Sequence, residues 1–118
     1  MNFSGIKALG ISGVITREFT WNYKAPKNSK NQKGAQIDLI FDRDDSVISL
    51  CEIKCHNDLF TIDKKYASEL KNKISTFQSQ TNTSKTIFLV MITVTGLNKN
   101  MHYQELIDNE LTLKDFFC

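Results

Sequence analysis

The chain has 118 residues, of which 41% are hydrophobic and 24% are charged, and 15 basic against 13 acidic side chains give a net charge of +2. This length is typical of one domain, so residues 1–118 are taken as a single folded unit. The near-neutral charge excludes a histone-like polycation, and one proline with five glycines excludes a collagenous or low-complexity chain. Nucleic-acid binding stays open, because it depends on local charge.

The sequence shows no sign of secretion or membrane insertion. The longest apolar run, residues 87–92, is far shorter than the ~20 residues that a membrane-spanning helix needs. The first residues lack the basic and then apolar pattern of a signal peptide. Three cysteines, Cys51, Cys55 and Cys118, are an odd number, which argues against a full disulfide framework. The sequence therefore predicts a cytoplasmic protein without membrane contact.

The N-terminal third combines a predicted helix end, a strand and a basic segment. Residues 6–10 are expected to close a helix, and residues 14–23, rich in β-branched and aromatic side chains, are expected to form a strand. Residues 24–33 are too polar to build a core, so they are expected to form a mobile basic loop. This loop either is only solvated or binds nucleic-acid phosphates. Its lysines are Lys24, Lys27, Lys30 and Lys33.

The remaining elements follow from hydrophobic periodicity. Residues 35–42 and 47–55 are β-prone and are separated by a polar turn at 43–46, as in a hairpin. Apolar side chains then recur every three or four residues, which predicts an amphipathic helix. Residues 85–95 resemble a buried central strand. The residues of the helical stripe are Ile62, Tyr66, Leu70, Ile74 and Phe77.

The order of these elements predicts the topology. A helix between two strands is the crossover that parallel neighbours require, so strand 85–95 is expected to run parallel to strand 47–55. The predicted fold class is therefore α/β, with a mixed sheet and an amphipathic helix crossover. The tail is ambiguous: residues 112–115 have the form of a capping box, but little chain follows them.

Charged residues inside apolar strands require an explanation, because a buried carboxylate is costly unless it is paired or binds a cation. Asp38 lies in the first hairpin strand, and Glu52 and Lys54 lie on one face of the second. A three-residue turn at positions 44–46 would place Asp38 directly opposite Glu52, whereas a two-residue turn would place them on opposite faces. We predict the three-residue turn, or a bulge with the same effect.

This pattern resembles the core of the PD-(D/E)XK nuclease superfamily, in which a hairpin carrying the acidic residues and the lysine is followed by a helix and a further strand. The wider sequence is similar to the C-terminal nuclease-like domain of a bacterial and archaeal family of predicted AAA-type ATPases. The resemblance implies a restriction-endonuclease-like core that forms the C-terminal part of a longer ATPase. The segments that carry it are 34–40, 50–54, 65–67 and 91–93, with 6–11 and Trp21 in agreement.

The resemblance implies a metal-dependent nuclease acting on DNA. Asp38, Glu52 and the backbone carbonyl of Ile53 would bind Mg²⁺ or Mn²⁺, which favour oxygen ligands. The metal would activate water and neutralise charge on the phosphodiester, and Lys54 would stabilise the transition state. The resemblance also implies that basic residues hold the nucleic-acid backbone. These are the lysines of the 24–33 loop together with Lys64 and Lys65.

Two alternatives remain open. The first is that Asp38, Glu52 and Lys54 form a structural ion-pair cluster. The second is that the domain has lost cleavage and serves nucleic-acid binding or protein assembly. Many family members add an acidic residue from the helix before the sheet, whereas Lys7 is the charged residue in that place here. Tyr66 is interpreted as part of the apolar core of the helix.

Overall fold

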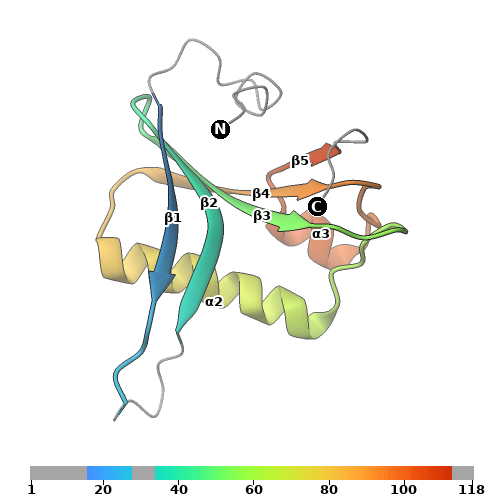
Figure 1. The fold of residues 1–118 in the computed structure, drawn as a ribbon, viewed down its shortest axis with the longest axis horizontal. Helices are drawn as coiled ribbons and strands as arrows, with labels where there is room; N and C mark the ends of the chain where they lie inside the picture. Colours follow the sequence, from blue (N-terminus) through green and yellow to red (C-terminus); the bar gives the residue numbers. More distant parts are fainter. Residues whose placement is uncertain (1–15, 28–33, 113–118) are drawn as a thin grey trace.

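The computed structural model describes residues 16–27 and 34–112. Their five strands form one sheet in the order β1-β2-β3-β4-β5 (Figure 1). Strand β2 pairs antiparallel with both β1 and β3, whereas β4 pairs parallel with both β3 and β5. This arrangement confirms the predicted α/β fold with a mixed sheet. The elements are β1 (Thr16–Tyr23), β2 (Ala35–Arg43), β3 (Val47–Lys54), α2 (Lys64–Thr81), β4 (Thr86–Thr93), α3 (Met101–Leu106) and β5 (Asn109–Thr112).

The hairpin of β2 and β3 has the predicted register. Leu39 pairs with Cys51 and Asp42 pairs with Ile48, so partner numbers sum to 90 as a three-residue turn requires. Ser46 ends the turn with φ of 69°, the left-handed conformation that closes three-residue hairpin loops. The register therefore brings Asp38 and Glu52 to matching positions.

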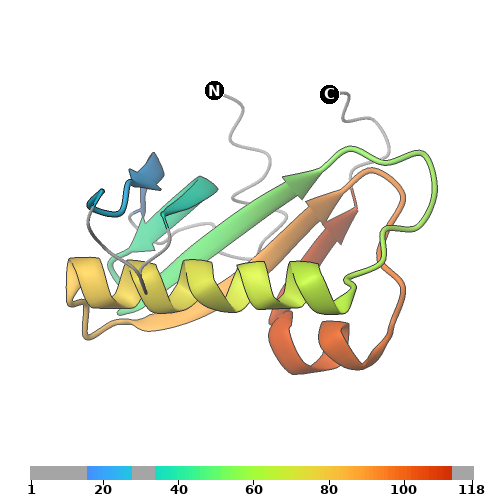
Figure 2. The same cartoon turned by 90° about the horizontal axis from the view of Figure 1, so that it is seen from below.

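Helix α2 is the predicted crossover between β3 and β4, and it lies along one face of the sheet (Figure 2). Its N-cap Asp63 accepts a hydrogen bond from the Tyr66 backbone N–H at 2.8 Å, and Asn82 ends the helix in the left-handed conformation. The predicted stripe faces the sheet: Leu70 and Phe77 are buried and Ile74 packs against them. The capping and the stripe together fix the position and orientation of the helix.

The apolar core occupies both faces of the central strands. Ile40, Leu50 and Leu70 belong to the cluster between the sheet and α2. Phe41 and Cys51 belong to a second cluster on the opposite face, with Val90 and Ile92. Strands buried on two faces carry nearly continuous apolar runs, which is why residues 85–95 read as a central strand. Glu52 interrupts this pattern on the α2 face of β3.

The sequence did not predict α3 and β5. Helix α3 has no buried residue and β5 has four residues, so neither carries a clear periodic pattern. Thr112 is the last residue of β5; the rest of the possible capping box, residues 113–115, and the predicted helix end at 6–10 lie outside the described residues. No helix in the described part of the chain is long and apolar enough to cross a membrane.

Candidate metal centre

Strands β2 and β3 separate at the end of the hairpin opposite the turn. Their pairing ends at Leu39 and Cys51, while β3 continues along β4 as far as Lys54. On its other side β2 is bulged, because two of its residues, 38 and 39, oppose one residue of β1. Figure 1 shows β2 curving away from β3 beyond this point. Bulges of this kind re-aim side chains and are frequent beside active sites.

Where β2 and β3 separate, the side chains of Asp38 and Glu52 accept hydrogen bonds from backbone N–H groups. The Ile53 backbone N–H donates to Asp38 Oδ2 at 3.0 Å, and the Asp38 backbone N–H lies 3.5 Å from Glu52 Oε2. Each carboxylate thus takes a backbone N–H that a continued β-ladder would have used. The charges of the two carboxylates are close enough to interact.

Glu52 is also paired with a lysine from α2. Lys73 Nζ donates to Glu52 Oε1 at 2.5 Å. The Glu52 side chain is 2% exposed and the Lys73 side chain 21% exposed, so the pair bridges the interior and the solvent. Burial raises the pKa of Glu52, and the Asp38 charge adds to this, while Lys73 opposes it. The net direction is upward, which means that burial outweighs the lysine.

Lys54 lies on the same face of β3 as Glu52 but contacts aromatic rings. Its Nζ is 4.7 Å from the centroid of the Tyr66 ring and 5.8 Å from that of Phe60. The Tyr66 hydroxyl is buried and has no hydrogen-bond partner among the described residues. Burial, followed by the charges of Glu52 and Asp38, raises the Tyr66 pKa. Tyr66 is half-buried and packs against the core cluster, and its hydroxyl lies near the charges of Glu52 and Asp38.

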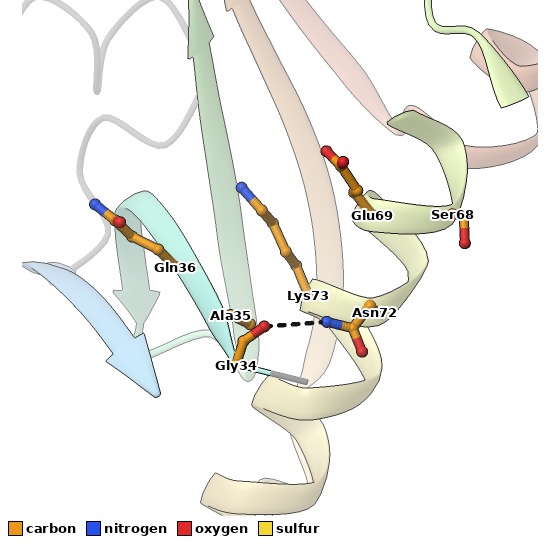
Figure 3. A pocket seen from close by; sticks show the side chains of 7 residues that line it. All are labelled: Gly34, Ala35, Gln36, Ser68, Glu69, Asn72 and Lys73. Atoms are coloured by element: carbon orange, nitrogen blue, oxygen red, sulfur yellow. Dashed lines mark hydrogen bonds between the residues drawn. The ribbon is translucent and has the colours of Figure 1, made fainter. Parts of the chain in front are cut away.

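A cavity of about 470 Å³ lies beside this cluster, between the start of β2 and α2 (Figure 3). Asn72 Nδ2 donates to the Gly34 carbonyl at 3.4 Å, and this hydrogen bond connects the two sides of the cavity, α2 and the start of β2. Glu69 and Lys73 rise from α2 on the same side of the cavity. Solvent therefore reaches the lysine that holds the buried carboxylate. The lining residues are Gly34, Ala35, Gln36, Ser68, Glu69, Asn72 and Lys73.

The lysines predicted to hold nucleic acid lie at two places. Lys64 and Lys65 are exposed in the first turn of α2, next to the Tyr66 ring that Lys54 contacts. Lys24 and Lys27 are exposed beyond β1, and Lys24 lines a hollow that shares Gly34, Ala35 and Gln36 with the cavity. Lys30 and Lys33 lie outside the described residues.

The donor set fits a hard divalent cation. Asp38 and Glu52 offer carboxylate oxygens, the ligands that Mg²⁺ and Mn²⁺ prefer. A cationic group, the Lys73 ammonium, already lies against Glu52 Oε1, so the opening accommodates positive charge. Within residues 16–27 and 34–112, no three His, Cys, Asp or Glu side chains gather as a larger metal cluster. Two carboxylates with the predicted Ile53 carbonyl would leave the remaining positions to water and substrate.

Lys73 is the site residue that sequence reasoning missed. It follows Leu70 by three positions and precedes Phe77 by four, so it shares the face of α2 that packs on the sheet. A lysine at such a position is expected to have a buried partner. That spacing is the signal that could have identified it.

Comparison with known proteins supports the fold. No protein-family model and no curated protein matches the chain. A similar solved structure is the crystal structure of a protein of unknown function, AF1548, with a TM-score of 0.57 and 17% sequence identity. The match covers 92% of this chain and 53% of the other, so this chain spans about half of that length. At this identity the likeness concerns the fold.

Proposed function

We propose that this domain is a metal-dependent nuclease of the PD-(D/E)XK superfamily, with a restriction-endonuclease-like core, that hydrolyses phosphodiester bonds of DNA. The observation that carries the proposal is the pair of carboxylates at the open end of the hairpin. The Asp38 carboxylate accepts a hydrogen bond from the Ile53 backbone N–H of β3, and the Glu52 carboxylate accepts one from the Asp38 backbone N–H of β2. This linkage fixes two oxygen donors at one opening, beside a solvent-reached cavity.

The residues have separable roles in this proposal. Asp38, Glu52 and the Ile53 carbonyl would hold Mg²⁺ or Mn²⁺, and the bound metal would supply an activated water and charge neutralisation. Lys54, held near the site by the Tyr66 and Phe60 rings, would place a positive charge beside the scissile phosphate. Tyr66 would keep that lysine in place.

Electrostatics around the site favour a polyanionic substrate. Lys64 and Lys65 occupy the first turn of α2, which contains no acidic residue. Basic residues there oppose the helix dipole and cost stability, and a bound phosphate would offset this cost. Lys24 and Lys27 would contact the same backbone further along. In the longer protein that the resemblance implies, an ATPase domain would be the partner of this module.

A second candidate function is a nuclease-fold module that binds nucleic acid or other proteins without cleavage. It is favoured by the Lys73 ammonium, which already satisfies Glu52, and by Lys54, which contacts aromatic rings instead of the carboxylates. In such a module the cluster would be a structural ion pair.

A cleavage assay with Mn²⁺ on plasmid and single-stranded DNA separates the two candidates. We expect the wild type to cut DNA and Glu52→Ala to be inactive. Glu105→Ala is the matched control, because that glutamate is half exposed and pairs with Lys71 on the surface. Metal-independent cleavage, or cleavage that Glu52→Ala retains, would reject the proposed enzyme. DNA binding without cleavage would support the second candidate.

A further inference from the structure

The Lys73 ammonium occupies the place beside Glu52 at which a bound metal ion would have to lie. Lys73 Nζ lies 2.5 Å from Glu52 Oε1, and Glu52 is almost completely buried. A buried carboxylate without a counter-ion is strongly destabilising, so the folded protein needs a positive charge at this place before any metal binds. A divalent cation on the same carboxylate would be repelled by that ammonium, since like charges a few ångströms apart oppose each other strongly in a partly buried site.

Lys73 has a second acceptor within the same cavity. Glu69 lies four residues earlier on α2, and both side chains line the cavity and rise from the same side of the helix (Figure 3). A glutamate four residues before a lysine is the favourable order for a helical ion pair. Within the described part of the chain, Glu69 takes part in no ion pair. The cavity provides the room in which the lysine side chain can turn outward.

We propose that Lys73 is a positioning residue that acts as an exchangeable counter-ion. It holds Glu52 in place when no metal is bound, and a divalent cation displaces it to Glu69 when the site is loaded. This inference rests on the proposed function, because it requires that Glu52 binds a metal. It adds that competition between the metal and the Lys73 ammonium for Glu52 sets the metal affinity. Glu69 affects this affinity by accepting the displaced ammonium, without contacting the metal.

Isothermal titration with Mn²⁺, without DNA, tests the exchange. We expect Lys73→Met to bind Mn²⁺ about tenfold more tightly than the wild type, because the competing charge is gone. Lys71→Met is the matched control: it lies on the same helix, pairs with Glu105 on the surface, and is expected to bind like the wild type. Equal or weaker binding by Lys73→Met would overturn the inference.

A second variant keeps the test informative if Lys73→Met does not fold. Glu69→Gln changes an exposed side chain and is expected to weaken Mn²⁺ binding about twofold, the worth of one helical ion pair. Where Lys73→Met does fold, the same change in that background is expected to have no effect. An unchanged affinity in Glu69→Gln alone, or an equal loss in both backgrounds, would contradict the exchange.

The outcome also separates this inference from the proposed function. If the wild type and every variant fail to bind Mn²⁺, the metal site is wrong and the exchange falls with it. If the wild type binds Mn²⁺ through Glu52 and Lys73→Met leaves the affinity unchanged, the metal site stands and the exchange alone is wrong.

Discussion

The two ends of the β2–β3 hairpin carry the same pair of groups, a carboxylate and a lysine, in different surroundings. At the turn end, Lys85 Nζ contacts Asp42 Oδ1 at 2.6 Å and the Arg43 carbonyl at 2.8 Å, and the strands remain paired. At the open end, Lys73 contacts Glu52 at 2.5 Å, where the pairing has stopped. The Asp42 side chain is 24% exposed and the Glu52 side chain 2% exposed.

The two ion pairs differ in how deeply the carboxylate is buried. Solvent screens the Asp42–Lys85 pair, so it contributes little and costs little. At Glu52, in contrast, burial of the carboxylate has a desolvation cost, and the backbone N–H groups of Asp38 and Ile53 bond to carboxylates instead of to backbone carbonyls. A costly arrangement beside a solvent-accessible cavity supports the proposal that this end of the hairpin has a function besides stability.

We expect the two ends of the hairpin to differ most in their effect on DNA cleavage. Asp38→Asn is expected to reduce Mn²⁺-dependent DNA cleavage about a thousandfold or more, because the metal loses a carboxylate ligand. Asp42→Asn changes a carboxylate on the same strand at the other end and is expected to leave the rate within a factor of about two. Equal losses in the two variants would show that the two ends of the hairpin do not differ in their importance for cleavage. Initial rates on plasmid DNA measure both.

The next prediction concerns stability without metal. Lys73→Met is expected to lower the free energy of unfolding by about 3 kcal/mol, because it leaves the buried Glu52 without a counter-ion. Lys85→Met is expected to lower it by at most about 1 kcal/mol, because the Asp42 pair is partly solvated. Urea denaturation measures both values. A Lys85→Met loss as large as that of Lys73→Met would show that burial does not distinguish the two ends.

The raised pKa of Glu52 predicts a pH dependence. The folded protein holds this proton more tightly than the unfolded chain, so Glu52 lowers the folding stability as pH rises from the unfolded pKa, about 4.5, through the folded pKa. Glu52→Gln removes this term, so the unfolding free energy of the variant is expected to rise relative to the wild type over that interval. Denaturation at a series of pH values measures the difference. A constant difference would contradict the raised pKa.

The smallest prediction concerns the turn end alone. Ser46 has φ of 69°, a conformation that glycine adopts more easily than serine. Ser46→Gly is expected to stabilise the fold by up to about 1 kcal/mol and to leave Mn²⁺ affinity unchanged. Thermal denaturation with and without Mn²⁺ checks both statements. A changed affinity would mean that the turn and the open end are coupled.

The sequence predicted the carboxylate pair because successive side chains of a β-strand point to alternate faces of the sheet. Once three residues were assigned to the turn, Asp38 was expected opposite Glu52; the observed pairs, which end one position earlier at Leu39 and Cys51, have the register that this turn requires. The long helix was predictable for the same kind of reason, from the spacing of Leu70, Ile74 and Phe77. The coarse α/β topology then followed from the order of elements.

The partner of Glu52 was harder to predict, because it depends on how α2 crosses the sheet. Lys73 is one of several lysines on the helix, and periodicity places it only near the buried stripe. Short elements were missed for a different reason. Helix α3 buries no residue and β5 spans four, so tertiary context rather than local pattern determines them.

A calorimetric titration of Mn²⁺ into the wild type and Glu52→Gln directly tests whether Asp38 and Glu52 hold a divalent cation. The proposed metal centre predicts one Mn²⁺-binding site in the wild type and none in Glu52→Gln, with Asp42→Asn binding like the wild type. Undiminished Mn²⁺ binding by Glu52→Gln, or no binding by the wild type, would contradict it.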